Sequence, residues 1–171
     1  MIDLLSKKVL FIDLDGTLIK TISGKTFPED VSDFKIQLAV LDKIVEKFPY
    51  LVYFFIVTNQ GGIGKFINRS DFNAKLYSIN LFCKYYLDSK IKSILYFDEM
   101  YCCSTDKTDS YRKPNTGMLE KLVNYWNILT KEECIMIGDA SGKPGDFSDS
   151  DKKCAENFGI DYIDVRDFLK L

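Results

Sequence analysis

The sequence has no histidine among its 171 residues, and this absence excludes two common catalytic designs. A Ser-His-Asp or Cys-His nucleophile cannot form, and zinc hydrolysis that depends on imidazole ligands is excluded as well. Acid–base chemistry near neutral pH therefore falls to carboxylates, lysine, tyrosine or cysteine.

Patterned cysteines and long hydrophobic runs are also absent. The five cysteines are odd in number and form no C-x-x-C pair, so neither a disulfide framework nor a zinc finger is indicated. We expect reduced, mostly buried thiols, with Cys134 in an apolar strand and Cys154 on a helix face. No stretch approaches the roughly 18 apolar residues of a membrane span, and the N-terminus meets a strand before a secretory segment could form.

The charges are nearly balanced. The 23 Lys and Arg against 25 Asp and Glu give a net charge of −2, which argues against a large non-specific nucleic-acid footprint but allows a small one. The chain has ordinary globular composition, with 46% hydrophobic and 28% charged residues and no repeat or linker. We expect a single domain over residues 1–171 in an intracellular protein, cytoplasmic or nuclear, that is not secreted and does not contact membranes.

Apolar strand patterns alternate with helical patterns along the chain. Strands are predicted at residues 8–12, 50–57, 91–97 and 134–137, with a weaker edge strand at 161–163. Helices are predicted at residues 38–48, 72–86, 119–126 and 151–157. We expect Ser70 to cap the second helix, Thr130 to open a capping box, and Gly159 to end the last helix. This alternation predicts an α/β, doubly wound, Rossmann-like and mostly parallel sheet with helices on both faces and its binding site beyond the carboxyl ends of the strands.

Two carboxylates, Asp13 and Asp15, follow the first predicted strand, and Gly16 lets the backbone turn sharply after them. Side chains at i and i+2 at the end of a strand point the same way. Two like charges held together favour a divalent cation, and they divide into one ionised group and one that can carry a proton. Taken alone, Asp-x-Asp-Gly is equally compatible with a plain turn.

The second predicted strand ends at Val57, and Thr58 and a glycine-rich loop follow it. A threonine hydroxyl and backbone N–H groups freed by glycines form an anion-binding nest. The loop is not a Walker A motif, because Asn59 and Phe66 occupy positions where that motif needs glycine and Ser or Thr, so no ATP-binding kinase site is indicated. An ordinary glycine-rich turn is the alternative interpretation.

Two further loops carry charge. Arg112 and Lys113 precede a proline that fits a helix start, although a solvated cation pair would look the same. Asp139 follows a buried strand, and Asp146, Asp149 and Asp151 come before the next helix. Asp149 and Asp151 could equally be caps of that helix.

The four loops, in the order Asp-x-Asp-Gly-Thr, Thr-Asn, Lys-Pro and Gly-Asp, resemble those of the haloacid dehalogenase-like hydrolase superfamily. More closely, the chain resembles the phosphatase domain of polynucleotide kinase/3′-phosphatases over residues 9–168. The most specific segment is Gly-Asp-Ala-x-Gly-Lys at 138–143, followed by Asp-Phe-Ser-x-x-Asp at 146–151. The other matching segments are residues 13–19, 23–28, 32–34, 58–60, 62–64, 111–114 and 116–118.

This resemblance implies a capless haloacid dehalogenase-like fold and a chemistry for each loop. Asp13 would be the nucleophile that forms an aspartyl-phosphate, and Asp15 would protonate the leaving alcohol and then activate water. Mg²⁺ would be held by Asp13, the backbone carbonyl of Asp15 and Asp139, with Asp151 supporting the metal shell.

The resemblance also assigns the phosphate contacts. Thr58 and Asn59 would donate hydrogen bonds to the phosphoryl oxygens, and Gln60 would also bind the substrate. Lys113 would balance the charge that builds during transfer. The intervals between Asp13, Thr58 and Lys113 leave no room for a cap domain, which suits the end of a polymer. Four cations would steer the flanking strand or are simply solvated: Lys25, Lys65, Arg69 and Arg112.

The resemblance therefore implies a Mg²⁺-dependent phosphatase for 3′-phosphates of polynucleotide (DNA) ends, acting in strand-break repair. The short interval between Gly142 and Asp146 and the lack of a kinase domain depart from the family, so we expect a stand-alone monomeric enzyme beside a ligase or a separate kinase. A histidinol-phosphate or heptose-bisphosphate type of phosphatase is one alternative. Of the four positions of the zinc loop of those enzymes, Tyr101, Cys103, Asp109 and Tyr111, one holds a suitable ligand. The other alternative is a catalytically silent module that binds nucleic-acid ends.

Overall fold

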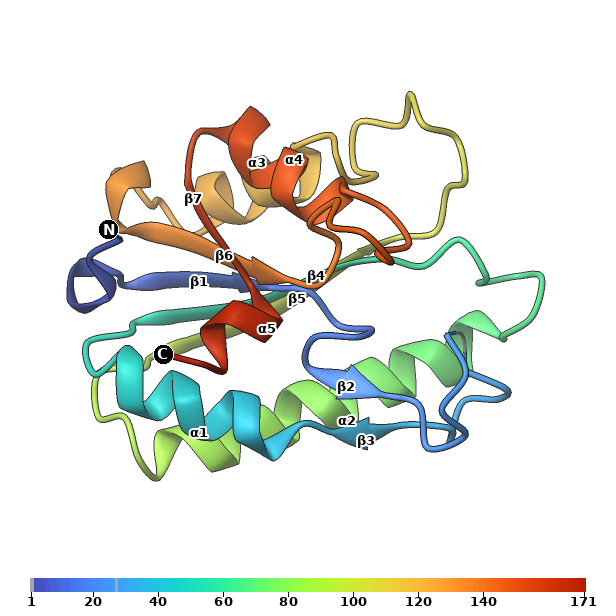
Figure 1. The fold of residues 1–171 in the computed structure, drawn as a ribbon, viewed down its shortest axis with the longest axis horizontal. Coiled ribbons are helices and arrows are strands. Elements are labelled where there is room, and N and C mark those ends of the chain that lie inside the picture. The colour runs from blue at the N-terminus through green and yellow to red at the C-terminus, as the bar shows by residue number, and fades with distance from the viewer. Residues whose placement is uncertain (1, 27) are drawn as a thin grey trace.

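The computed structural model describes residues 2–26 and 28–171, and its centre is a five-stranded parallel sheet (Figure 1). The strand order is β5-β4-β1-β6-β7, and every neighbouring pair is parallel. The strands are β1 Val9–Ile12, β4 Tyr53–Asn59, β5 Tyr96–Cys102, β6 Cys134–Gly138 and β7 Asp161–Asp164. The α/β fold with a mostly parallel sheet is confirmed.

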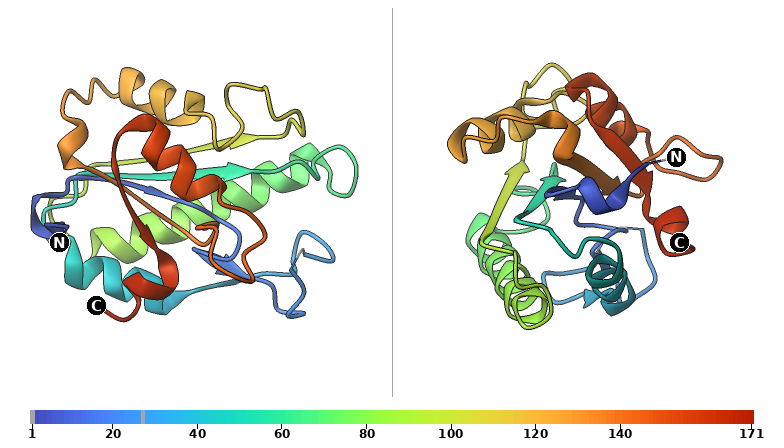
Figure 2. Two further views of the ribbon diagram at one scale, coloured as in Figure 1. Left: turned by 45° about the horizontal axis from the view of Figure 1, so that its top comes forward. Right: turned by 90° about the vertical axis from the view of Figure 1, so that its left-hand side faces the viewer.

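Helices cover both faces of this sheet (Figure 2). On one face lie α1 Leu38–Lys47, α2 Arg69–Asp88 and the short α5 Val165–Phe168, and on the other lie α3 Gly117–Tyr125 and α4 Ser150–Phe158. Two single turns of 3₁₀ helix, η1 Leu4–Ser6 and η2 Lys131–Glu133, complete the helical elements. None of the helices in the described residues is long and apolar enough to cross a membrane.

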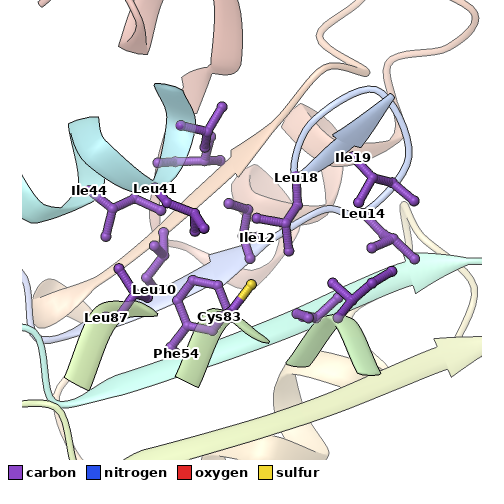
Figure 3. Close-up of a cluster of buried hydrophobic side chains, with 14 of the residues drawn as sticks. Leu10, Ile12, Leu14, Leu18, Ile19, Leu41, Ile44, Phe54, Cys83 and Leu87 are labelled. Carbon is purple, nitrogen blue, oxygen red and sulfur yellow. The ribbon is translucent and has the colours of Figure 1, made fainter. Parts of the chain in front are cut away.

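The central strand β1 explains how the core is divided. Leu10 and Ile12 face the α1 and α2 side, and Val9 and Phe11 face the α3 and α4 side, because successive strand residues alternate between faces. All four side chains are buried, as expected for a parallel strand covered on both sides. Figure 3 shows the hydrophobic cluster on the α1 and α2 side of the sheet, in which Leu10 and Ile12 contact side chains from α1, α2 and β4.

Several predicted boundaries need correction. The third strand begins at Tyr96 instead of residue 91, because Ile91 and Ile94 are apolar for a different reason: they pack into the core from the connection before β5. Ser70 lies inside α2, which has Asn68 at its N-cap position. Thr130 precedes a single 3₁₀ turn and makes no side-chain cap.

Other local predictions are confirmed. Gly159 ends α4 in the left-handed conformation with φ of 83°, and its N–H donates to the Ala155 carbonyl. Cys134 and Cys154 are buried, and the five cysteines are free thiols. Burial raises the pKa of each of these two thiols to about 12, which keeps both protonated and unreactive.

A short two-stranded ladder lies between β1 and α1 in the chain. Its strands are β2 Ile19–Lys20 and β3 Lys35–Ile36, which pair antiparallel. We call residues 19–36, excluding residue 27, the β2–β3 segment. Asp33 holds it together, because its carboxylate accepts the Ser23 N–H at 2.8 Å, the Ser23 hydroxyl at 2.6 Å and the Glu29 N–H at 2.9 Å.

Because of these hydrogen bonds, the stability of the folded protein should depend on the ionisation of Asp33 at acidic pH. The Ser23 hydroxyl, with the backbone N–H groups of Glu29 and Ser23, lowers the pKa of Asp33 to about 2. The folded-state pKa is below the unfolded value of about 3.9, so the stabilisation is present above that value and is lost as the pH falls towards about 2. We expect Asp33→Asn to lower the melting temperature at neutral pH and to weaken its fall in acid. Thermal unfolding across this pH range measures both, and exposed Asp88→Asn is the control; identical profiles for Asp33→Asn and the unmodified protein would contradict the assignment.

Candidate active site

The polar loops predicted from the sequence meet at the carboxyl edge of the sheet. From β1 the chain moves outward through β4 to β5 and then returns to the other side of β1 at β6. In doubly wound sheets this change of direction opens a crevice beyond the carboxyl ends of the central strands. Asp13 follows β1 at that point, and Asp139 follows β6 beside it.

Lys113 lies at the centre of this crevice and is almost completely buried, with 3% of its surface exposed. Its Nζ is 2.6 Å from Asp13 Oδ1 and 2.7 Å from Asp151 Oδ1, and it donates to the Val57 carbonyl at 2.8 Å. The three partners come from the ends of β1 and β4 and from the first turn of α4. Lys113 therefore connects three elements that are far apart in the sequence.

Asn59 fixes the backbone on which Lys113 lies. Its Oδ1 accepts the Lys113 N–H at 2.9 Å, and its Nδ2 donates to the Lys113 carbonyl at 2.9 Å. These two bonds make Asn59 a positioning residue for Lys113. They use one of the two N–H groups of its amide, so the predicted hydrogen bond from Asn59 to phosphate stays a prediction.

Three carboxylates surround this lysine. Oxygens of Asp13, Asp139 and Asp151 lie within 4.8 Å of one another, and Asp13 and Asp151 are buried. Burial raises the pKa of Asp13 well above its usual range, and the charges of Asp151 and Asp139 add to the rise while Lys113 opposes it. Burial and the Asp151 charge raise the pKa of Asp139 to about 6.

This cluster fits a divalent cation. Three carboxylates against one ammonium leave an excess of negative charge in a buried place, and hard oxygen donors suit Mg²⁺. A bound cation would also reverse the pKa directions given above, because its charge favours ionised carboxylates. Within residues 2–26 and 28–171, this is the one group of acidic, cysteine or histidine side chains placed to hold a metal.

Two glycines make the close approach of these carboxylates possible. Gly16 has φ of +82°, and a Cβ added there would lie 2.0 Å from Asp139 Oδ2. A Cβ added at Gly138 would lie 2.3 Å from Asp151 Oδ2. The sequence predicted the sharp turn at Gly16, and the structure adds the second reason that this position must be glycine.

Asp15 is half-buried and is held by Gln60. The Gln60 Nε2 donates to Asp15 Oδ2 at 2.5 Å and to the Thr58 hydroxyl at 3.0 Å. These bonds orient Asp15 and Thr58, and the direct contact of Gln60 with substrate stays a prediction. Its sequence position after a strand could not indicate this partner, because Asp15 lies 45 residues earlier.

Asp151 is not the helix cap that its sequence position allowed. One of its oxygens pairs with Lys113 and the other accepts the Ala140 N–H at 3.1 Å, so it links the loop after β6 to the lysine. Asp149 occupies the N-cap position of α4 without a side-chain cap bond. Asp146 closes its own loop by accepting the Ser141 N–H and hydroxyl at 3.1 and 2.7 Å, and it also pairs with Arg166.

The four cations predicted to steer the flanking strand differ in their surroundings. Lys65 is exposed on the loop after β4, whereas half-buried Arg112 donates to the Ser104 carbonyl at 2.7 Å. Arg69 Nη2 lies 3.4 Å from the Cys103 sulfur, and Lys25 pairs with Glu29. Among the described residues, none of these four cations forms an ion pair with the carboxylates of Asp13, Asp139 or Asp151.

A parallel sheet with a buried Asp–Lys–Asp cluster at its carboxyl edge, and a second aspartate two residues after the first, defines a haloacid dehalogenase-like phosphatase. Two solved structures share this fold. The D,D-heptose 1,7-bisphosphate phosphatase from B. bronchiseptica, complexed with magnesium and phosphate, has a TM-score of 0.64 at 16% identity, covering 91% of this chain and 78% of that one. A putative HAD-like phosphatase from Mesorhizobium loti also has a TM-score of 0.64, at 20% identity, covering 90% and 69%.

The sequence comparisons identify the family. Residues 8–168 match the family described as polynucleotide kinase 3 phosphatase, and the chain belongs to it. It is 32% identical to the bifunctional polynucleotide phosphatase/kinase of Schizosaccharomyces pombe over 96% of this chain and 38% of that protein. An uncharacterised 20.8 kDa protein of Autographa californica nuclear polyhedrosis virus is 30% identical over 96% of this chain and 86% of its own length.

A third relative has a different name and a different role. The histidine biosynthesis bifunctional protein of Legionella pneumophila (strain Lens) is 29% identical over 93% of this chain and 41% of that protein. The chain thus spans about two fifths of the length of these bifunctional relatives and most of the length of the viral one.

Proposed function

We propose that this phosphatase removes the 3′-phosphate from polynucleotide ends, DNA ends in particular, during strand-break repair. The observation that carries the proposal is the family match over residues 8–168. The small β2–β3 segment supports it, because a site without an inserted cap domain in the described residues can admit the end of a long strand. The product would be a 3′-hydroxyl that a ligase can use, beside a separate kinase for the other end, and we propose that the chain acts as an intracellular monomer.

We further propose that the carboxylate cluster holds Mg²⁺. Asp13, Asp139 and the backbone carbonyl of Asp15 would be its protein ligands. Asp151 would support the site indirectly, through its ion pair with Lys113. When bound, the cation would neutralise negative charge on the transferred phosphoryl group and on Asp13.

The first half of the reaction uses Asp13 and Asp15. An Asp13 carboxylate oxygen forms a bond to phosphorus while the bond from phosphorus to the 3′-oxygen breaks. Asp15 gives its proton to that oxygen, and Gln60 keeps Asp15 in position through the 2.5 Å hydrogen bond. Thr58 donates to a phosphoryl oxygen, and Lys113 keeps the nucleophile oriented.

The second half releases phosphate. Asp15, now ionised, takes a proton from water, whose oxygen attacks the phosphorus of the aspartyl-phosphate. The bond between phosphorus and the Asp13 oxygen breaks, so inorganic phosphate leaves and both carboxyl groups return to their starting states. No histidine is required, in agreement with its absence from the sequence.

The histidine biosynthesis relatives favour a second candidate, a phosphatase for small phosphate esters. The two candidates are separated by comparing kcat/KM with Mg²⁺ for a nicked DNA duplex bearing a 3′-phosphate, histidinol phosphate, a heptose bisphosphate and an aryl phosphate. The proposal requires a preference for the 3′-phosphate by orders of magnitude. Equal or faster turnover of histidinol phosphate or the heptose bisphosphate would replace it with the second candidate.

Removal of divalent metal should stop the enzyme. We expect EDTA to reduce phosphate release to background and excess Mg²⁺ to restore it, because the excess negative charge of the cluster would otherwise repel the phosphate. The same cation should raise the melting temperature, since it binds the folded state. Asp139→Asn should lose most of the Mg²⁺-dependent rise. Unchanged activity in EDTA would contradict the metal assignment.

A further inference from the structure

Lys75 on α2 is a buried lysine without a hydrogen-bond partner. Its surface is 6% exposed, and within the described part of the chain no hydrogen bond or ion pair reaches its Nζ. The two other buried lysines are fully engaged. Lys113 binds two carboxylates and a carbonyl, and Lys7 donates to the Glu132 carbonyl at 2.5 Å and pairs with Asp161 at 2.5 Å.

The surroundings of Lys75 place its charge on one side of the active site. Its Nζ lies 4.8 Å from the centroid of the Phe34 ring, which belongs to the β2–β3 segment. Burial lowers the pKa of Lys75, and the negative charge of Asp15 is the strongest influence that raises it. The nearby Asp33 carboxylate is already occupied by Ser23 and Glu29. The ammonium therefore lies between α2 and the β2–β3 segment, and Asp15 forms an isolated β-bridge with Ile19 at the start of that same segment, which puts Lys75 on the Asp15 side of the crevice.

Burial of most of the Lys75 side chain costs free energy, because it removes part of the water around the ammonium and no hydrogen bond from the described residues replaces it, while the Nζ itself still reaches solvent. The Phe34 ring offsets part of this cost through its negative face. The three N–H donors of the ammonium stay available, and an anionic group would satisfy them through charge-assisted hydrogen bonds. This combination of burial, charge and free donors points to a ligand.

The identity of the ligand follows from the position of Asp15 and rests on the function proposed above. Asp15 protonates the leaving oxygen, so the remainder of the substrate extends from the Asp15 side. In the proposed mechanism Thr58 donates to the transferred phosphoryl group and Lys113 orients Asp13. Both residues lie outside α2 and the β2–β3 segment. We propose that Lys75 binds a second phosphate of the substrate, the phosphodiester on the 5′ side of the terminal nucleotide.

This assignment makes Lys75 a specificity residue for polymer ends. A strand carries that phosphodiester, whereas an aryl phosphate or a nucleoside 3′-monophosphate does not. A small bisphosphate could supply the same chemistry, so the test includes one.

The test compares substrates that differ in one charge. The first pair is a short 3′-phosphorylated DNA strand whose last internucleotide linkage is either a native phosphodiester or a neutral methylphosphonate. The second pair is a nucleoside 3′-monophosphate and a nucleoside 3′,5′-bisphosphate, with a heptose bisphosphate and an aryl phosphate beside them. The proteins are the unmodified chain, Lys75→Met, Lys75→Arg and the control Lys84→Met, which changes an exposed lysine of the same helix.

We expect the unmodified chain to prefer the native linkage by about ten- to a hundredfold in kcat/KM. Lys75→Met should lose this preference by slowing the native strand to the rate of the methylphosphonate strand, with the change mainly in KM. Its turnover of the nucleoside 3′-monophosphate should be unchanged, and its melting temperature should not fall. Lys75→Arg should keep part of the preference, and Lys84→Met should behave as the unmodified chain.

Three outcomes would overturn the proposal. An equal loss on the native and methylphosphonate strands would make Lys75 a structural residue. Retention of the linkage preference in Lys75→Met would place the second phosphate elsewhere. A charge preference confined to the heptose bisphosphate would exclude the phosphodiester as the ligand. Failure of the proposed function looks different, because the unmodified chain would then cleave the strand no better than the aryl phosphate.

Discussion

Asp13→Asn is expected to abolish phosphate release from every substrate, by about 10⁴-fold or more, because removal of a covalent nucleophile eliminates the pathway itself. The fold should survive. Asn has nearly the same shape, and the change removes one of three carboxylates that crowd a single ammonium. Without Mg²⁺ the melting temperature should therefore stay the same or rise.

The measurement is single-turnover phosphate release, together with a search for label on the protein from a ³²P-phosphorylated substrate. The unmodified chain should carry acid-stable, base-labile label during turnover, and the variant should carry none. Asp88→Asn, at an exposed position of α2, is the matched control and should be fully active. Full activity in Asp13→Asn would remove the covalent step from the mechanism.

Lys113→Met is expected to have the second large effect, and it acts on both activity and stability. Turnover should fall by about 10³-fold, since the ammonium that orients Asp13 is gone. In EDTA the free energy of unfolding should fall by about 3–5 kcal/mol, because buried Asp13 and Asp151 lose their shared partner. Urea unfolding in EDTA measures this loss.

A double variant separates the two effects. Adding Asp151→Asn to Lys113→Met removes one of the stranded charges, so it should recover part of the lost stability while the enzyme stays inactive. Unfolding free energies for Lys113→Met equal to those of the unmodified chain would show that the buried network does not contribute to stability.

The sequence was sufficient to predict the parallel sheet and the residues that follow its strand ends. Asp13, Thr58 and Asp139 each come directly after an apolar run, so the strand pattern itself places them at one edge. The start of β5 was misplaced because a buried connection and a buried strand give the same apolar pattern. Ile91 and Ile94 pack into the core without belonging to a strand.

Side-chain partners were harder to predict. The sequence predicts phosphate contacts for Gln60 and Asn59 but gives no sign of the partners that the structure shows for them, Asp15 and the Lys113 backbone, which are remote in sequence. Lys75 was missed because a lysine within a helix is usually solvated. A signal was present: Lys75 lies three residues after Phe72, on the face of α2 that packs into the core. A charged residue on a predicted apolar face is the pattern that would have found it.

The most direct test of the proposed function uses one oligonucleotide with its phosphate at either end. We would measure kcat/KM with Mg²⁺ for the same DNA strand phosphorylated at the 3′ end and at the 5′ end. We expect the 3′-phosphate to be removed faster by orders of magnitude. Equal rates at the two ends, or no release from either, would contradict the assignment to polynucleotide 3′ ends.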